Sequence, residues 1–579
     1  MLGLSGFCTY ITCRLYFKKL PDKPSESIGI VFILSLIFLF IFEGAYVKIL
    51  KRFERWDPQH RVFRSIEHPY GKRRFMTEED ETENFELSKN INDFTGKILG
   101  IDSRGRMVSK KEYMEYGNEH TIVFGNSGTK KGVAFVIPQC LQIINKGRSA
   151  VIVSTKDDNY SILANIARKN GYTVWAFTLR PGETEHSDAI DFTKLIKGRM
   201  DIAQTCAQCI IETTSPGERP DYWYRGERHL LFALLIYFSY QEQTLKDLYN
   251  FILEGLDHLE SVLDLISPNH PAYGSYRIFR GDTSKSRTVK QQVVEGLGVR
   301  LASFMADENM QEIVSNDEIS FEKMCQKKCL CFVVVSDKTS VYKALSSMFL
   351  SLMFFSFGSY AEKFGGSLPS PIEVIIDEAF ASGSIPDFAS VMATARGNRV
   401  HITTILQSLP QLDILYPNIS KGIANDCGTK ILVHTDDKDT AQYFSDLAGT
   451  FTAEQTMKNA QENVHGSRVM PVELLSVSEI LGKDIDKQIV HISGATNPTI
   501  ILDKQPWFSN WPGSKTLFFN KKNGKTYHSH PLLVNYKKIP LNKHTPKWAK
   551  EKASRMKQQQ ERIQNYKFKE SVNAKRFEF

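Results

Sequence analysis

Short apolar runs recur along the middle of the chain and alternate with segments of helical periodicity. The runs lie at 120–124, 149–153, 173–177, 330–335, 372–376, 400–406 and 430–434. Most are apolar at nearly every position, which is typical of strands that are buried on both faces of a parallel sheet. The pattern therefore predicts an α/β fold with a parallel sheet covered on both faces by helices.

The alternation is interrupted once, by residues 196–325. This segment is rich in helical patterning, as in RHLLFALLIYFSY (228–240), and has few strand signals, so we expect an inserted all-α domain. The apolar run at 342–357 has the composition of a membrane helix. Because it is short, contains Lys343 and falls between two strands, we expect a buried helix that covers the sheet.

An apolar stretch at residues 28–47 is about the length that spans a bilayer core. It lacks a clear small-x-small cleavage site, which argues against a signal peptide. Lys48, Lys51, Arg52 and Arg55 follow it, and this basic cluster predicts a membrane helix with all later residues in the cytoplasm. Residues 1–16 are also fairly apolar but contain Arg14, so the number of membrane passes, one or two, stays open.

Charge is distributed unevenly along the 579 residues, which carry 73 Lys and Arg against 65 Asp and Glu. Residues 1–74 have a net charge of +7 and residues 537–579 one of +9, whereas residues 75–536 have one of −8. The composition excludes a disordered chain and a small disulfide scaffold. The basic ends weaken the idea that the whole body coats nucleic acid.

The nine cysteines are scattered, and two groups raise the question of a metal site: Cys206 with Cys209, and Cys325 with Cys329 and Cys331. The groups are more than 100 residues apart and have no histidine in register. Thiols in a cytoplasmic body stay reduced, so we expect buried free cysteines.

The first strand is followed by a loop of small residues and lysines, HTIVFGNSGTKKGVAFVIP. A strand, a glycine-rich loop, a lysine and a helix form the P-loop arrangement, in which backbone N–H groups and the helix N-terminus bind phosphate. The candidate nucleotide-binding residues are Gly125, Asn126, Ser127, Gly128, Thr129, Lys130, Lys131 and Gly132. Lys130 takes the place of the second motif glycine and Gly132 that of the Ser or Thr, so an ordinary glycine-rich turn stays an alternative for this loop taken alone.

A later strand ends in two carboxylates, PIEVIIDEA, as a Walker B strand does. Asp377 is the candidate Mg²⁺ ligand, and Glu378 is the candidate group that polarises the attacking water. Gln407 ends the strand VHITTIL and is a candidate sensor or water-positioning residue. The carboxyl ends of parallel strands share one edge of a sheet, which is where such sheets bind ligands.

These motifs, with DYWYRGERHLLFALLIYF, ATARGNRVHITTILQSLPQL and DTAQYFSDLAG in the same order, resemble the TraG/TraD-type coupling proteins of type IV secretion over roughly residues 90–505. The resemblance implies a membrane-anchored, RecA-like ATPase of bacterial conjugation. In this family a homohexamer at the inner membrane recruits single-stranded DNA bound to a relaxase, and it uses ATP and Mg²⁺ to drive the DNA into the secretion channel.

Residue by residue, the resemblance assigns Lys131 to the P-loop lysine and Arg396 to an arginine offered to the ATP of a neighbouring subunit. It implies a membrane anchor at 1–74 in contact with inner-membrane lipid and a nucleotide-binding domain in two parts, 75–195 and 326–505. Residues 196–325 correspond to the family's all-α domain, which faces the cytoplasm and the relaxosome, and 506–579 form a basic tail.

Lys130 departs from the family pattern, because its position in the loop can require a positive φ that glycine adopts more readily. Slow hydrolysis, or a phosphate contact shared by Lys130, follows from this departure. Three alternatives stay open: a nucleotide-binding adaptor with weak or no hydrolysis, a DNA pump of the FtsK kind, and a motor for protein substrates. The sequence from residue 543 predicts a solvated, partly helical or disordered tail.

Overall fold

The computed structural model describes residues 55–112, 118–214, 222–282, 287–339, 341–458, 465–504, 517–520, 525–528, 532 and 537–576. The predicted membrane helix at 28–47 lies outside these residues. The chain forms two compact units, one of residues 1–74 with 448–476 and the other of residues 75–447 with 477–579.

The smaller unit contains an antiparallel sheet in the order β1-β2-β13-β14. Its strands are β1 (Trp56–Asp57), β2 (Val62–Arg64), β13 (Thr450–Lys458) and β14 (His465–Glu473). Arg64 pairs with Ala453 in the register of β2 and β13. The segment that follows the predicted anchor is therefore tied to a hairpin almost 400 residues later, a pairing that the sequence pattern does not predict.

The larger unit is built on a twelve-stranded sheet in the order β3-β5-β4-β16-β15-β12-β6-β11-β10-β7-β9-β8. From β12 to β8 all neighbours are parallel. The parallel strands are β6 (Thr121–Gly125), β7 (Ser149–Ser154), β8 (Thr173–Leu179), β9 (Cys329–Val335), β10 (Ile372–Ile376), β11 (Val400–Leu406) and β12 (Thr429–His434). Each coincides with one of the predicted apolar runs to within one residue at its start, and the predicted parallel sheet is confirmed.

Beyond β12 the sheet continues with antiparallel strands. They are β15 (Lys487–Ile492), β16 (Thr499–Asp503), β4 (Ile98–Ile101), β5 (Met107–Lys110) and β3 (Phe85–Ser88). The apolar pattern of the sequence does not predict these short strands.

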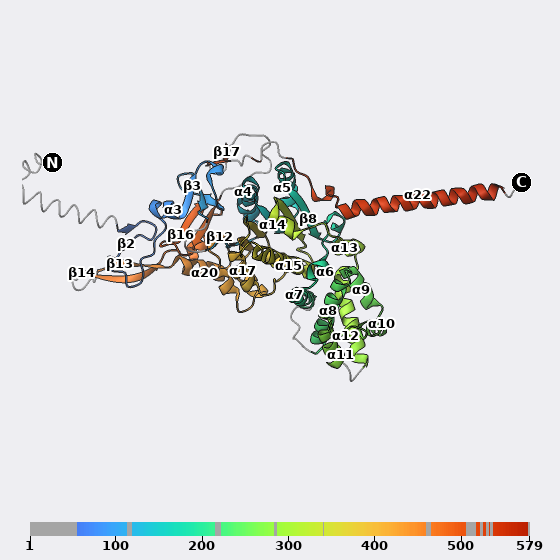
Figure 1. Ribbon diagram of the computed structural model, residues 1–579. Coiled ribbons are helices and arrows are strands. Elements are labelled where there is room, and N and C mark those ends of the chain that lie inside the picture. The colour runs from blue at the N-terminus through green and yellow to red at the C-terminus, as the bar shows by residue number, and fades with distance from the viewer. Residues whose placement is uncertain are drawn as a thin grey trace, which may run out of the picture. The chain divides into compact units, whose positions relative to one another are not determined.

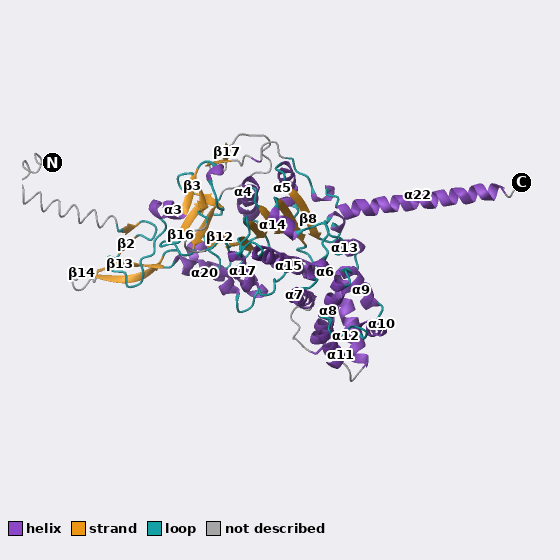
Figure 2. Cartoon of the chain, in the orientation of Figure 1, coloured by secondary structure: helices purple, strands orange, loops and turns teal. Residues whose placement is uncertain are grey.

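Helices cover both faces of the parallel strands (Figure 2). On one face, α4 (Ile137–Lys146) packs against β7, and α5 (Asp158–Lys169) packs against β8 and β9. On the other, α15 (Lys343–Glu362) packs against β9, and α17 (Phe388–Gly397) packs against β11. Within the described residues α15 alone is long and apolar enough to cross a membrane, and 78% of its apolar window is buried in the protein. The predicted buried covering helix is confirmed.

The predicted helical insertion is also confirmed, and its helices α7 to α12 gather below the sheet in Figure 1. The insertion connects β8 to β9, which are neighbours in the sheet. A long insertion between adjacent strands leaves the sheet intact. Its helices are α6 (Phe192–Ile196), α7 (Met200–Thr214), α8 (Tyr222–Tyr240), α9 (Leu245–Leu253), α10 (Leu256–Leu263), α11 (Tyr273–Asp282), α12 (Arg287–Met305), α13 (Glu308–Ile313) and α14 (Phe321–Gln326).

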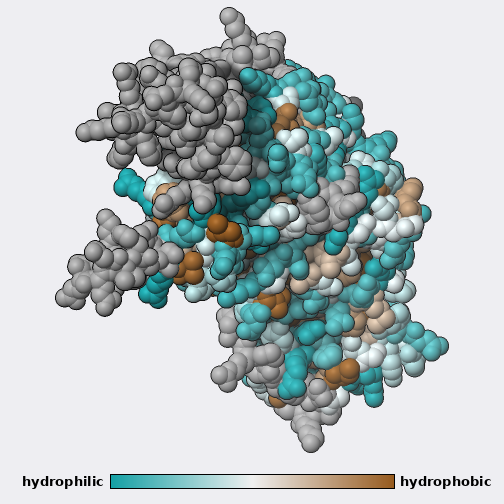
Figure 3. Space-filling model, turned by 90° about the vertical axis from the view of Figure 1, so that its left-hand side faces the viewer, coloured by the Kyte–Doolittle hydropathy of each residue, from teal (hydrophilic) through white to brown (hydrophobic). Residues whose placement is uncertain are grey.

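The remaining elements are short, apart from the last helix. They are α3 (Glu78–Asn84), α16 (Ala379–Ser382), α18 (Leu409–Leu415), α19 (Ser420–Asn425), α20 (Lys438–Ala448), α21 (Val477–Leu481), the hairpin of β17 (Leu517–Asn520) and β18 (Lys525–His528), and α22 (Lys547–Arg576). On the surface shown in Figure 3 hydrophilic residues predominate, and the exposed apolar side chains are scattered, as is ordinary for a folded protein.

The start of the C-terminal segment is packed on the body, which differs from the predicted solvated tail. Trp548 is 3% exposed, and its indole N–H donates to the Ser187 carbonyl at 2.7 Å. His544 lies 2.9 Å from Asp188. From residue 553 to 561 every side chain of α22 is exposed. The difference arises because Trp548 and His544, within a lysine-rich stretch, contact buried residues that lie more than 350 residues earlier in the chain.

Candidate nucleotide-binding site

The loop between β6 and α4 is a tight curve with two residues in the left-handed region. Gly128 has φ +79°, and Lys130 has φ 68°. The Thr129 hydroxyl donates to the Asn126 carbonyl at 2.7 Å and closes the turn. The chain then enters a π-helical turn, Gly132–Val136, that continues into α4. A tight loop that leads directly into the start of a helix is the arrangement that binds phosphate in P-loop proteins.

The Lys131 side chain lies within this curve and is 7% exposed. Its ammonium donates to the Gly125 carbonyl and, at 3.2 Å, to the Asn126 carbonyl. It also lies 3.6 Å from Glu378 Oε1. A cation held by loop carbonyls and one carboxylate is well placed to contact a phosphate in the loop.

The strand order brings the second motif to the same place. β11 lies between β6 and β10, so the residue after β11 stands between the loop and the carboxylates that follow β10. The Gln407 amide donates to Glu378 Oε2 at 3.2 Å. Lys131, Glu378 and Gln407 therefore form one connected group, although they come from three strands.

Asp377 has the chemistry expected of a cation ligand. It is half-buried, and its Oδ1 atom is buried and has no hydrogen-bond partner among the described residues. Burial raises the pKa of Asp377 to about 6, with a further increase from Glu378 and a decrease from Lys131. A buried carboxylate oxygen without a donor, next to a second carboxylate, fits a divalent cation such as Mg²⁺.

Lys130 does not point into the loop. Its ammonium pairs with Asp486 Oδ1 at 2.9 Å, and the side chain is 47% exposed. Its φ of 68° confirms that this position needs a positive φ, the conformation for which glycine is the usual residue. Gly132 is different, because a Cβ atom there would meet nothing within 4 Å. A Ser or Thr side chain would fit at 132, so space does not explain its absence.

The family model for type IV secretory system conjugative DNA transfer matches residues 75–537. The chain belongs to this family. No curated protein matches the sequence.

Solved structures of a bacterial conjugative coupling protein, TrwB, are similar in fold. The unbound form has a TM-score of 0.54 at 13% identity, covering 82% of this chain and 98% of that one. The complex of TrwB with ADP and Mg²⁺ also has a TM-score of 0.54, at 14% identity and with coverage of 77% and 95%. The predicted RecA-like α/β fold is thus confirmed for this member of the conjugative DNA transfer family.

Arg396 is the predicted site residue that the fold keeps apart from the others. It lies near the end of α17, four residues before β11 begins, whereas Gln407 follows the end of β11. The seven residues of β11 separate them by about 20 Å. Arg396 is exposed. At this distance the Arg396 side chain does not reach the nucleotide-binding site of its own subunit. Its predicted contact with the ATP of a neighbouring subunit stays a proposal.

The cysteines behave as predicted. All those in the described part of the chain are free and buried, among them Cys206, Cys209 and Cys331. Burial raises the pKa of the Cys209 thiol to about 11, so it stays protonated. In the described residues no cysteine belongs to a cluster with metal-binding geometry.

Two groups of contacts in the larger unit were not predicted. One is the contact of Asp486 and Lys504 with the loop. The other is a buried charged group around Glu373 and His401 at the opposite edge of the sheet. The sequence offered a sign of the Glu373 and His401 group, because these two are charged or polar residues inside strands that are otherwise largely apolar. The sequence offered no sign of the contact between Asp486 and the loop, because nothing in the local sequence around residue 486 marks it as a neighbour of residue 130.

Proposed function

We propose that this member of the conjugative DNA transfer family is an ATPase that drives DNA transfer. It uses ATP hydrolysis to move relaxase-bound, single-stranded DNA toward a type IV secretion channel. The observation that carries the proposal is the connected group of Lys131, Glu378 and Gln407 beside the unpartnered oxygen of Asp377.

Each residue has a role that its surroundings support. The loop from Gly125 to Gly132 would hold the phosphates, and Lys131 would contact the outer ones. Asp377 would hold Mg²⁺, which when bound neutralises phosphate charge. Glu378, whose carboxylate is held by Gln407 and lies near Lys131, would accept a proton from the attacking water.

For the assembly we propose a homohexamer at the bacterial inner membrane, anchored in lipid by one or two N-terminal helices, with the bulk of the chain in the cytoplasm. Its partners would be the relaxase with its DNA strand and components of the channel. Family membership supports the DNA and the secretion system as partners in general.

A nucleotide-binding adaptor with little hydrolysis is the second candidate, and Lys130 in the P-loop is the observation that favours it. Against it, Lys130 adopts the required positive φ and pairs with Asp486, so the loop keeps its curve. A DNA pump of the FtsK kind is a further alternative, and it would be stimulated by double-stranded rather than single-stranded DNA.

The test is ATP turnover by the full-length protein in detergent, with and without single-stranded and double-stranded DNA. We expect stimulation by single-stranded DNA. Glu378→Gln should keep nucleotide binding and lose turnover by about 100-fold or more, whereas Lys131→Ala should lose both. Wild-type turnover in Glu378→Gln would contradict the proposed mechanism, and binding without turnover in the wild type would favour the adaptor.

Lys130→Gly is the matched variant within the same loop. Because it restores the usual motif, it should preserve or raise turnover. If Lys130→Gly is inactive while Lys131→Ala stays active, Lys130 makes the phosphate contact and the motif is shifted by one residue.

A further inference from the structure

A segment far along the chain contacts the phosphate-binding loop from outside. This segment, residues 483–486, connects α21 to β15. Asp486 pairs with the Lys130 ammonium at 2.9 Å. The backbone N–H of Asp486 donates to Asp484 Oδ1 at 3.0 Å, which holds the segment in a turn and presents the Asp486 carboxylate.

A second contact comes from Lys504, the residue after β16. Its side chain is buried at 4% exposure. The ammonium donates to the Thr129 carbonyl at 3.2 Å and to the Ile485 carbonyl. One buried cation therefore joins the loop to segment 483–486, on the side opposite to Glu378 and Gln407.

These contacts fall on the strained part of the loop. A non-glycine residue in the left-handed region is strained and stays there only when its surroundings hold it. The Thr129–Lys130 peptide is held from both sides, through the Thr129 carbonyl by Lys504 and through the Lys130 side chain by Asp486. The contacts give a physical reason why lysine can stand where the motif has glycine.

We propose that Asp486 and Lys504 are positioning residues of the phosphate-binding loop, which hold Thr129 and Lys130 in the shape that binds nucleotide. The inference rests on the proposed function, and it deepens it: segment 483–486 and the end of β16 set the affinity of a loop that lies more than 350 residues earlier. Neither residue touches the reacting atoms.

The test is a double-mutant cycle in the full-length protein, with ADP and Mg²⁺ as the ligand and calorimetry as the measurement. Asp486→Asn should weaken ADP binding by about three- to fivefold, the range of an exposed ion pair. In the Lys130→Gly background the same change should have no effect, because glycine adopts the positive φ without an anchor. Asp426→Asn, an exposed change before β12 at the other edge of the sheet, is the matched control.

Lys504→Met supplies a second readout. It removes both hydrogen bonds of the ammonium and should weaken binding by about tenfold. Burial lowers the pKa of Lys504 to about 8, with a further decrease from Lys130 and increases from Asp486 and Asp484. The other cations and imidazoles that face it are Lys483 and His434. The affinity gap between wild type and Lys504→Met should therefore narrow as the pH rises through about 8.

The outcomes separate the two proposals. Equal ADP affinity of the wild type and Asp486→Asn would overturn this inference alone, as would an equal loss in both loop backgrounds. A wild type that binds no nucleotide would contradict the proposed function and with it the inference. Thermal melting of each variant distinguishes lost affinity from lost folding. Asp486→Asn, a change at a half-exposed position, keeps the test valid even if Lys504→Met does not fold.

Discussion

At the level of single residues, the candidate site combines backbone strain with a desolvated carboxylate oxygen. Glu378 has φ 60° and Lys130 φ 68°, and both are non-glycine residues in the left-handed region. Asp377, next to Glu378, has one buried carboxylate oxygen without a hydrogen-bond partner among the described residues. Each of these features makes the ligand-free protein less stable. Features of this kind cluster at functional sites, where the function requires them.

Asp377→Asn should therefore stabilise the ligand-free protein. The pKa of Asp377 is about 6 in the folded state, compared with an ordinary value of 3.8, so folding disfavours the ionised form. This free-energy cost is absent at low pH, where Asp377 is protonated in both the folded and the unfolded protein. It grows as the pH rises from about 4 to about 6 and reaches its full value above that range. At pH 8 the gain has an upper limit of about 3 kcal/mol.

Melting temperatures at pH 8 and pH 5 check this prediction. The difference between Asp377→Asn and the wild type should be largest at pH 8 and shrink at pH 5, while Asp426→Asn shows no such trend. If Asp377→Asn melts below the wild type at pH 8, desolvation of the Asp377 carboxylate does not destabilise the folded protein.

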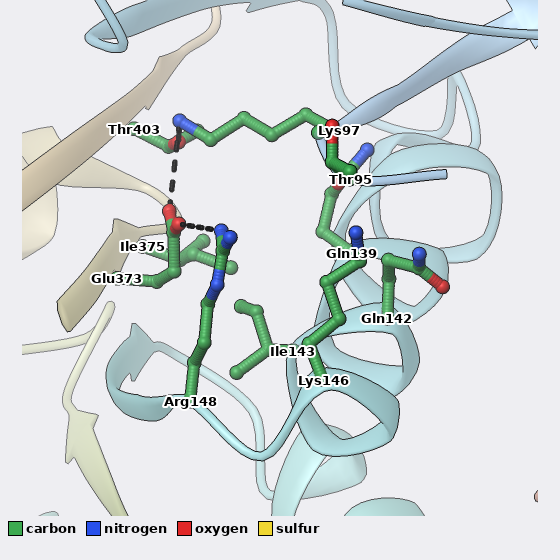
Figure 4. Close-up of a pocket in the computed structure, with 11 residues that line it drawn as sticks. Thr95, Lys97, Gln139, Gln142, Ile143, Lys146, Arg148, Glu373, Ile375 and Thr403 are labelled. Carbon is green, nitrogen blue, oxygen red and sulfur yellow. Dashed lines mark hydrogen bonds and ion pairs between the residues drawn. The ribbon is translucent and has the colours of Figure 1, made fainter. Parts of the chain in front are cut away.

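At the level of elements, a buried charged group fixes the register of the two strands that carry the site. Glu373 on β10 and His401 on β11 are register partners, and Glu373 Oε1 lies 2.8 Å from His401 Nδ1. Lys97 and Arg148 approach the same carboxylate, at 3.7 Å and 3.3 Å, beside a small cavity (Figure 4). This group lies at the edge of the sheet opposite to Asp377 and Gln407.

Glu373→Gln should destabilise the protein by about 3–5 kcal/mol, because it removes the buried carboxylate charge that pairs with the half-buried Lys97 and Arg148. Burial alone would raise the pKa of Glu373, but His401, Lys97 and Arg148 overcome it, so the pKa is lowered. The lowered pKa of Glu373 stabilises the folded protein. This contribution is present above the pKa of the unfolded state, about 4.3, and is lost as the pH falls toward the pKa of the folded state.

The measurement is thermal melting at pH 7 and below pH 4, with the exposed Glu83→Gln as control. We expect a large gap between wild type and Glu373→Gln at pH 7 and a smaller gap at low pH. Equal melting temperatures at pH 7 would mean that the buried group adds no net stability.

At the level of the whole molecule, the position of Arg396 requires a second subunit if this residue is to reach ATP. Arg396→Ala and Glu378→Gln should each be inactive alone. In mixed oligomers roughly a quarter of random interfaces would pair an intact Glu378 with an intact Arg396, so mixing should restore part of the turnover. No recovery on mixing would exclude a role in trans, and full turnover of Arg396→Ala at every protein concentration would exclude the arginine role altogether.

The C-terminal segment from residue 553 onward is the candidate for a sequence-independent contact with DNA. Residues 553–579 carry seven basic and three acidic residues. Since Trp548 and His544 pack on the body, a deletion should begin after Lys552 rather than at residue 537. We expect this deletion to flatten the salt dependence of DNA binding without abolishing ATP turnover, because fewer counterions are released.

DNA affinity measured over a series of salt concentrations checks this, with Arg555→Gln, Lys557→Gln and Arg562→Gln combined as a variant that keeps the chain length. An unchanged salt slope in both proteins would rule out α22 as a DNA contact and leave lipid, a protein partner or no partner.

The sequence by itself determined the parts of this protein that are encoded locally. The apolar runs of the parallel strands, the loop from Gly125 to Gly132 and the carboxylates after β10 are each legible within about twenty residues, because strand burial and phosphate binding require particular residue types at short spacing. Only the tertiary structure decided that β11 lies between β6 and β10, which joins Gln407 to Glu378. It alone placed Asp486 and Lys504 against the loop, since such contacts depend on how strands hundreds of residues apart are ordered in one sheet.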